Sequence, residues 1–270
     1  MKVACIQPKF HQDIEKCYSE IEFLLKKMFG EFNTCDIVCL PERWAPFFKD
    51  IPRNLQKERG EYYEFIKDLA KKYEVSFLSG AIWENRNNQK KPKITCYYFN
   101  KKGEEVGRQD KIHLYSYERE HFEPGQVLNI FELGGSKFAI LICFDIAFFE
   151  TPRLAVENGA DILFSPTQIR EDGMENWKVY LQARVLENRI PVAACNSFGN
   201  LFNRKFLGNS KILSFMNGYI SPSRLRIKEA PIKQSGFVFD EVDLIFPRKL
   251  RKIRLNERIE KSKISVKFVK

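Results

Sequence analysis

The chain has 270 residues, of which 44% are hydrophobic, 30% charged and 14% aromatic. This length is enough to enclose a hydrophobic core, and the composition is far from the apolar-poor composition of disordered proteins. The longest apolar stretch, residues 138–144, is much shorter than the roughly 18–20 residues that a membrane helix needs. The sequence therefore predicts one large folded domain and excludes disordered and membrane-spanning classes.

The formal net charge of +10 is concentrated at the C-terminal end of the chain. Residues 248–270 hold ten Lys or Arg and two Glu, a net charge of +8, which leaves only +2 for residues 1–247. We therefore divide the chain into a nearly neutral domain and a basic tail with its own role. The tail lacks the glycine-rich or aromatic spacing of nucleic-acid-binding segments, so we expect no nucleic-acid partner.

The N-terminus and the cysteines both indicate a reducing environment. The chain begins MKVACIQPKF, without the apolar segment and small-residue cleavage site of a secretory signal, so we expect a cytoplasmic protein with no membrane partner. Its seven cysteines are irregularly spaced and include no CxxC pair. This pattern indicates neither a disulfide framework nor a zinc site.

In the first half of the chain, apolar periodicity predicts alternating strands and helices. In chain order we expect a strand at 2–7, a helix from Asp13 to Gly30, a strand at 36–40, a helix at 62–73, and strands at 75–83 and 94–99 separated by a polar turn at 84–93. The run at 36–40 is apolar throughout and ends at Pro41, which is typical of a strand buried on both faces.

The second half repeats this alternation. We expect strands at 137–143, 161–165 and 191–196, helices beginning at Thr151 and spanning 177–188, and closing strands near 212–215, 225–228 and 237–244. No internal repeat or low-complexity segment is present. The expected architecture is a layered α/β fold with helices covering the sheets.

Three residues with reactive side chains follow predicted strands or turns, where layered α/β folds place their functional groups. Glu42 follows the strand at 36–40, Lys111 follows the hairpin region, and Cys143 ends the strand at 137–143. A thiol is a weak nucleophile until a base removes its proton or a cation lowers its pKa. Together these residues would provide a nucleophile, a base and an oxyanion partner.

Each of the three also has a structural alternative. Cys143 lies in an apolar strand and fits a packed core thiol, Glu42 fits a loop cap, and Lys111 fits a surface lysine. Spacing alone does not show whether the three side chains converge.

The motifs around these residues extend the pattern over most of the chain. Leu40-Pro41-Glu42, the KIHL segment that begins at Lys111, and Cys143-Phe144-Asp145 match an LPE, a KxHL and a CxD motif in that order. Further matching segments are MKVACIQP, EREHFEPG, ADILFSPT, ARVLEN, LGNSKIL and EVDL. The sequence resembles the nitrilase superfamily of carbon-nitrogen hydrolases.

This resemblance implies a four-layer αββα sandwich that pairs into an eight-layer homodimer, with residues 1–247 as the carbon-nitrogen hydrolase domain. It also implies that the tail, residues 248–270, packs along a neighbouring subunit. Glu42 would be the general base, Cys143 the nucleophile, Lys111 the oxyanion partner together with the backbone N–H of Phe144, and Glu118 an auxiliary glutamate. No metal or organic cofactor would be required.

One departure from the family pattern concerns the substrate. Ala147 stands where many relatives have an arginine in C-x-D-x-R-F-P-E, so this position offers no cation for a substrate carboxylate. We therefore expect neutral or amine-bearing amides to be preferred to ω-amides, unless Arg170 or another loop residue reaches the pocket. Residues expected to bind substrate are Phe144, Ala147, Trp44 and Gln168, and for Trp44 an ordinary core position is the alternative.

The expected function is hydrolysis of a small linear amide or carbamoyl compound through a cysteine thioester, releasing ammonia or an amine. Two alternatives stay open at this point. A nitrilase would use the same residues on a nitrile, and a catalytically inactive binding protein would keep only the fold. The intact Glu42, Lys111 and Cys143 argue against the inactive protein.

Overall fold

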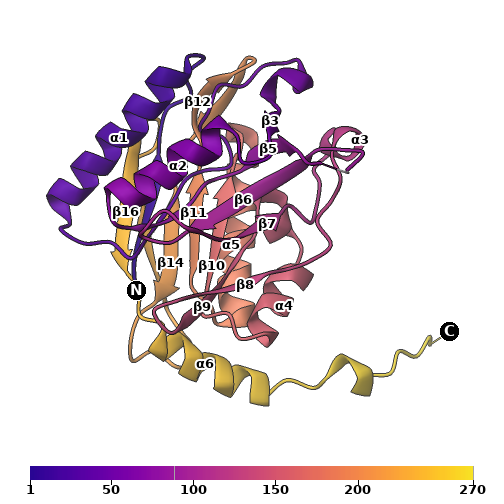
Figure 1. Ribbon diagram of the computed structural model, residues 1–270. Coiled ribbons are helices and arrows are strands. Elements are labelled where there is room, and N and C mark those ends of the chain that lie inside the picture. The colour runs from indigo at the N-terminus through magenta and orange to yellow at the C-terminus, as the bar shows by residue number, and fades with distance from the viewer. Residues whose placement is uncertain (88, 270) are drawn as a thin grey trace.

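The computed structural model describes residues 1–87 and 89–269. Position 88 of the predicted turn and position 270 of the predicted tail lie outside the described residues. Figure 1 shows two stacked sheets between two layers of helices, with a C-terminal arm that leaves the body.

Within the described residues, the first sheet has eight strands in the order β16-β1-β2-β4-β6-β5-β3, with β7 paired to β6. The strands are β1 (Lys2–Gln7), β2 (Ile37–Cys39), β3 (Gln56–Lys57), β4 (Ser76–Leu78), β5 (Ile82–Asn85), β6 (Lys93–Phe99), β7 (Glu105–Asp110) and β16 (Gly236–Glu241). Helices α1 (Ile14–Glu31) and α2 (Glu61–Lys72) cover its outer face (Figure 1). Helix α1 begins after Asp13, whose carboxylate accepts the backbone N–H of Lys16 at 2.9 Å as an N-cap.

The second sheet has six strands over the same described ranges, in the order β15-β14-β11-β10-β9-β8. They are β8 (Ile130–Leu133), β9 (Ser136–Ile140), β10 (Ile162–Thr167), β11 (Val192–Asn196), β14 (Lys211–Phe215) and β15 (Leu225–Glu229). Strands β9, β10 and β11 are parallel. Helices α4 (Glu150–Glu157) and α5 (Met174–Asn188) pack on the outer face of this sheet.

Alternation of side chains along the strands produces the layers. In β1, Val3 and Cys5 enter the core between the sheets, whereas Ala4 and Ile6 pack against α1 and α2. The second sheet divides its residues in the same way between the inter-sheet core and the helices α4 and α5. The predicted four-layer αββα sandwich is confirmed.

Most predicted strands and helices are present, but one predicted strand is divided. Residues 75–83 form β4 and β5, which are separated at Gly80. Gly80 has a φ of 71°, and a Cβ there would lie 2.2 Å from the carbonyl oxygen of Pro41. The chain therefore turns at Gly80, close beneath the loop that carries Glu42.

Several short elements did not follow from the sequence. They are the 3-10 helices η1 (Ile51–Asn54), η3 (Glu171–Gly173) and η4 (Lys261–Lys263), helix α3 (Glu118–His121), strands β3, β7 and β8, and the hairpin of β12 (Phe198–Leu201) and β13 (Arg204–Leu207). The hairpin forms a separate two-stranded sheet.

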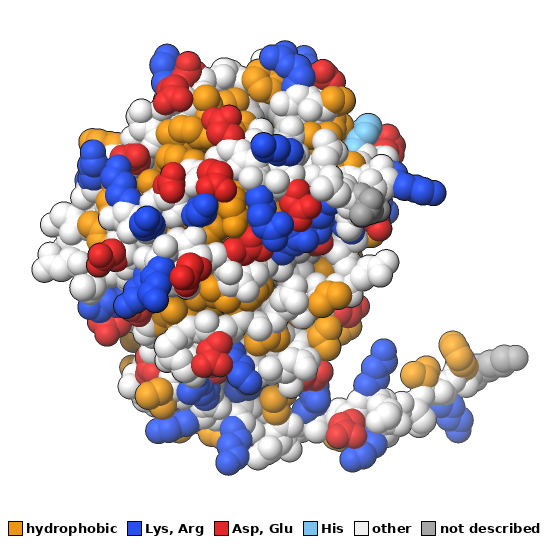
Figure 2. All heavy atoms as spheres, viewed as in Figure 1, with side chains coloured by type: hydrophobic (Ala, Val, Ile, Leu, Met, Phe, Trp, Pro, Cys, Tyr) orange, Lys and Arg blue, Asp and Glu red, His pale blue; other side chains and the backbone are white. Residues whose placement is uncertain are grey.

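The boundary predicted at residue 247 falls inside helix α6 (Ile245–Asn256). This helix packs on its own chain: Leu250 is buried in the core of the second sheet, Arg248 pairs with Asp161 at 2.6 Å, and Arg251 donates to the carbonyl of Ala160 at 2.6 Å. The first half of the tail thus belongs to the body of its own chain, and contact of the tail with a neighbouring subunit stays a prediction. Residues 257–269 extend away from the body, and Figure 2 shows Lys and Arg side chains along this arm.

Candidate active site

The predicted reactive residues meet where strands of both sheets end. Glu42 follows β2, Lys111 follows β7, and Cys143 begins a 3-10 turn, η2 (Cys143–Ala147), shortly after β9. The backbone N–H of Glu42 donates to the carbonyl of Thr167 at the end of β10 at 3.2 Å. This hydrogen bond ties the loop from the first sheet to the second sheet.

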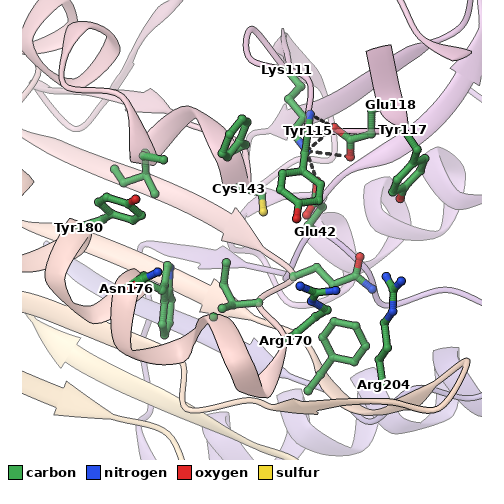
Figure 3. A pocket seen from close by; sticks show the side chains of 18 residues that line it. Glu42, Lys111, Tyr115, Tyr117, Glu118, Cys143, Arg170, Asn176, Tyr180 and Arg204 are labelled. Carbon is green, nitrogen blue, oxygen red and sulfur yellow. Dashed lines mark hydrogen bonds and ion pairs between the residues drawn. The ribbon is translucent and has the colours of Figure 1, made fainter. Parts of the chain in front are cut away.

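The backbone at Cys143 is strained. Its φ is 46°, in the left-handed region that residues other than glycine rarely adopt. Such a conformation is destabilising by roughly 1–3 kcal/mol and persists where the surrounding structure enforces it. The sharp turn directs the thiol away from the sheet and toward Glu42, as Figure 3 shows.

Lys111 joins the two glutamates at the centre of the site. Its Nζ lies 2.8 Å from Oε1 of Glu42 and 2.8 Å from Oε2 of Glu118. All three side chains are almost fully buried. The second glutamate is held in place because its Oε2 accepts the backbone N–H of Tyr115 at 2.7 Å.

Burial and charge act in opposite directions on Lys111. Burial opposes its charged form, but the carboxylates of Glu42 and Glu118 outweigh burial and hold the pKa of the ammonium group well above its ordinary value. Burial raises the pKa of Glu118, although Lys111 acts in the other direction. Lys111 is therefore a fixed cation across the neutral range and does not serve as a base.

The surroundings of Cys143 favour the protonated form of its thiol. Burial and the negative charge of Glu42 raise the pKa of this thiol well above its ordinary value, while Lys111 and the backbone of Gln168 oppose them. A protonated thiol needs a base at the moment of attack. Glu42 is the carboxylate that interacts with it.

A cavity of about 240 Å³ opens in front of these residues. This volume lies at the small end of ligand pockets, which are roughly 300–1,000 Å³, so the site fits a small molecule. The cavity is lined by Glu42, Lys111, Tyr115, Tyr117, Glu118, Cys143, Phe144, Ile146, Ala147, Gln168, Ile169, Arg170, Gly173, Asn176, Trp177, Tyr180, Arg204 and Phe206.

Of the residues expected to bind substrate, Phe144, Ala147 and Gln168 line this cavity, but Trp44 does not. Trp44 is buried among aromatic rings under α1 and α2, and its indole N–H donates to the carbonyl of Ser79 at 2.7 Å. The prediction for Trp44 is wrong because the chain after Glu42 turns toward the outer helices. Trp44 occupies an ordinary core position, which was the alternative interpretation of this residue.

Among the lining residues that were not singled out from the sequence, five carry a phenol, amide or guanidinium group: Tyr115, Tyr117, Asn176, Tyr180 and Arg204. Tyr115 and Tyr117 follow Lys111 closely, so the KxHL motif gave a signal for them. Asn176 and Tyr180 lie in the helix predicted near 177–188, but nothing in that pattern distinguishes its pocket-facing residues. Arg204 lies on the β12–β13 hairpin, for which no motif gave a signal.

The described residues include neither a candidate membrane span nor a candidate metal site. No helix in residues 1–87 and 89–269 is long and apolar enough to cross a membrane. In the same part of the chain, no group of three or more His, Cys, Asp or Glu is arranged to hold a metal ion.

Comparison with known proteins identifies the family. The family model for carbon-nitrogen hydrolases matches residues 2–220. The chain belongs to the carbon-nitrogen hydrolase family. The resemblance drawn from the three motifs is confirmed, and the predicted class of enzyme with it.

Two curated relatives of this carbon-nitrogen hydrolase span most of its length. The hydrolase in the agr operon of Staphylococcus aureus is 33% identical over 222 residues, which cover 79% of this chain and 83% of that protein. The 2-oxoglutaramate amidase of Bacillus subtilis is 29% identical over 227 residues, which cover 83% of each protein.

A solved structure has the same fold as this carbon-nitrogen hydrolase. The crystal structure of Saccharomyces cerevisiae Nit3, a member of branch 10 of the nitrilase superfamily, matches with a TM-score of 0.83 at 22% identity. The match covers 98% of this chain and 97% of that chain.

Proposed function

We propose that this carbon-nitrogen hydrolase cleaves a small linear amide or carbamoyl compound, with Cys143 as nucleophile, Glu42 as general base and Lys111 as oxyanion partner. The observation that carries the proposal is the buried cluster beside the thiol, in which Lys111 lies 2.8 Å from both Glu42 and Glu118. The amidase relative in Bacillus subtilis supports an amide as the substrate.

The first half of the reaction forms a thioester. Glu42 accepts the proton of the Cys143 thiol as the sulfur attacks the carbonyl carbon, and the developing oxyanion is stabilised by the Lys111 ammonium group and the backbone N–H of Phe144. Glu42 then donates its proton to the departing nitrogen. The carbon–nitrogen bond breaks, and ammonia or an amine leaves.

The second half regenerates the thiol. Glu42 takes a proton from water, the resulting hydroxide attacks the thioester carbonyl, and the carbon–sulfur bond breaks. The acid leaves and the sulfur recovers its proton. Glu118 acts through Lys111, because two carboxylates hold the ammonium group in one position through both halves of the reaction.

Ammonia release is the test of this function. The substrate panel contains aliphatic amides, ω-amides, carbamoyl amines and the matching nitriles, each incubated with the wild type and with Cys143→Ala. We expect ammonia from an amide or carbamoyl compound with the wild type and none with the variant. Turnover of nitriles alone would indicate a nitrilase, and no turnover of any member of the panel would favour a binding protein.

We also propose that the chain forms a homodimer through α4 and α5. Helix α5 buries Trp177, Leu181 and Val185 against its own sheet, yet Val179 on its outer side is 65% exposed. Phe149, beside α4, is 57% exposed. Exposed apolar side chains gathered on neighbouring helices support a contact with a second copy.

For the domain boundaries, we propose that the hydrolase domain includes α6 and that, within the predicted tail, only the arm of residues 257–269 contacts a neighbouring subunit. The arm carries the apolar side chains of Ile259, Ile264, Val266 and Phe268, which are 58–90% exposed. Apolar residues this exposed on an extended segment favour a partner surface.

A further inference from the structure

The cavity has an acidic side and a basic side. Glu42 and Glu118 lie at the catalytic end with Lys111 between them, while Arg170 and Arg204 lie across the cavity (Figure 3). We propose that Arg204, assisted by Arg170, binds a carboxylate at the far end of the substrate, so that the enzyme prefers amides that carry a distal acid. This inference rests on the proposed amide hydrolysis and names the substrate class.

Other cations near the cavity are already engaged. Lys111 is committed to two carboxylates. Arg184, which lies behind the wall of the cavity, donates to the carbonyls of Ile146 at 3.0 Å and Ala147 at 2.6 Å. Neither side chain is available for a carboxylate at the far end of the substrate.

Arg43 is also excluded by its position. Its guanidinium lies 3.5 Å from the ring centre of Trp83 and 4.0 Å from that of Phe47. The side chain is stacked between these rings and does not line the cavity. The two arginines of the basic side are therefore the groups that can meet a substrate anion.

Arg204 is the freer of the two arginines. Arg170 lies 3.1 Å from the carboxylate of Asp172 on the protein surface. Arg204 has no carboxylate within ion-pair distance among residues 1–87 and 89–269. A guanidinium that lines a ligand cavity and has no internal partner is suited to a carboxylate, which it can bind through two parallel hydrogen bonds.

The hairpin fixes the position of Arg204. Phe202 and Asn203, the two residues between β12 and β13, have φ values of 50° and 62°, which is typical of a tight two-residue hairpin turn. Phe206 packs edge-on against Phe10 at 5.3 Å and pairs through its backbone with Arg170. The hairpin that carries Arg204 is thus joined to Arg170 through one β-bridge at Phe206.

The charge of the catalytic end orients such a substrate. The catalytic end holds two glutamates and one lysine, and this excess of acidic side chains disfavours a substrate carboxylate there. The amide must reach Cys143, and the acid must therefore point to the arginines. Phe144, Ile146 and Ala147 also line the cavity and offer apolar surface to a short methylene chain.

This assignment reverses the preference expected from Ala147. In place of an arginine at position 147, the substrate carboxylate would meet Arg204 on the hairpin and Arg170 on the adjoining loop. In this arrangement the substrate carboxylate binds on the opposite side of the cavity from Cys143, and this position determines the substrate length that fits.

The test compares succinamic acid, the half-amide of a four-carbon diacid, with butanamide, a neutral amide of the same length. We expect the wild type to have a kcat/KM for succinamic acid at least tenfold higher than for butanamide. Arg204→Gln should lower kcat/KM for succinamic acid about 10- to 100-fold, mainly through KM, and reduce or abolish the preference. Arg170→Gln should have a smaller effect, because Asp172 already shares its charge.

Lys205→Gln is the matched control, since it removes the same charge from the adjacent exposed residue of β13, which does not line the cavity. Lys205→Gln should leave kcat/KM unchanged for both succinamic acid and butanamide. A wild type that hydrolyses butanamide equally well or better would overturn the carboxylate assignment and leave amide hydrolysis standing. If the wild type released ammonia from neither compound and from no member of the wider panel, both the carboxylate assignment and the proposed amide hydrolysis would be overturned.

Binding measured without turnover separates affinity from chemistry. In Cys143→Ala, calorimetry should give a dissociation constant for succinamic acid that rises about 10- to 100-fold when Arg204→Gln is added. Lys205→Gln in the same background should not change it. An equal affinity with and without Arg204 would contradict the proposal even if the variant had altered activity.

Discussion

Asp145 holds the loop of His113 against the turn that carries Cys143. Its Oδ1 accepts the backbone N–H of His113 at 2.7 Å and lies 3.0 Å from the ring Nδ1 of the same residue. Its Oδ2 accepts the backbone N–H of Ile142 at 2.9 Å. One buried carboxylate thus fixes Lys111 and Cys143 relative to each other, which explains the aspartate in the CxD motif.

We predict that Asp145→Asn lowers both stability and activity. An asparagine presents an amide nitrogen to one of these N–H donors, and a buried donor left without an acceptor destabilises a fold by about 1–3 kcal/mol. Urea unfolding measures this loss, and ammonia release should fall at least tenfold because Lys111 and Cys143 are no longer aligned. Asp68→Asn, at an exposed site on α2, is the control. Full activity in Asp145→Asn would contradict the positioning role.

Lys111→Met tests the central ion cluster. Without the cation, two buried carboxylates face each other, so we expect the free energy of unfolding to fall by about 3–5 kcal/mol at pH 7.5, with loss of ammonia release. Lys71→Met, at an exposed site on α2, is the control and should change neither the free energy of unfolding nor ammonia release.

The loss of unfolding free energy in Lys111→Met should depend on pH in a defined direction. The pKa of Lys111 is raised in the folded state, so its stabilisation is complete below its unfolded pKa and is lost only as pH rises through the higher folded value. In the variant, burial raises the pKa of Glu118 without the opposing cation, so this carboxylate takes up a proton as pH falls. The difference from wild type in urea unfolding should therefore shrink from pH 7.5 to pH 5. A difference that grew on acidification would contradict the cluster electrostatics.

Val179→Glu tests the proposed dimer. In a two-fold contact the substitution enters the interface twice, so we expect the dimer dissociation constant to rise at least tenfold in sedimentation experiments. Phe23→Glu makes a comparable change at a 64% exposed site on α1 and should leave assembly unchanged. An unchanged dimer in Val179→Glu would exclude this face.

Truncation after Asn256 tests the arm. The deletion keeps α6 with its Arg248–Asp161 ion pair and buried Leu250, so we expect the thermal midpoint to stay within about 2 °C of wild type. Sedimentation should show weaker assembly, because the exposed apolar residues of the arm are gone. Unaltered assembly would leave the arm without an intersubunit role.

The sequence predicted those structural features that depend mainly on local residues. The strand at 2–7 has the predicted bounds, and Glu42 follows the end of a strand as expected, whereas Cys143 lies just beyond β9 and not at the end of a strand. Asp13 begins α1 because its side chain caps the helix. These features depend on residues that are neighbours in the chain.

Features set by distant contacts did not follow from the sequence. The division at Gly80 depends on the close approach of Pro41, and β7 was missed because its residues, EVGRQD, are polar. The place of Trp44 depends on the carbonyl of Ser79. Arg204 reaches the cavity only because its hairpin packs against Phe10, which lies nearly two hundred positions earlier.

The most direct test of the account is the mass of the enzyme during turnover. Wild type mixed with a hydrolysed amide and quenched in acid within milliseconds should gain the mass of the acyl group, and peptide mapping should place that mass on Cys143. Cys143→Ala should show neither the added mass nor ammonia release. Ammonia release that continues in Cys143→Ala, or an acyl group on another residue, would contradict the mechanism.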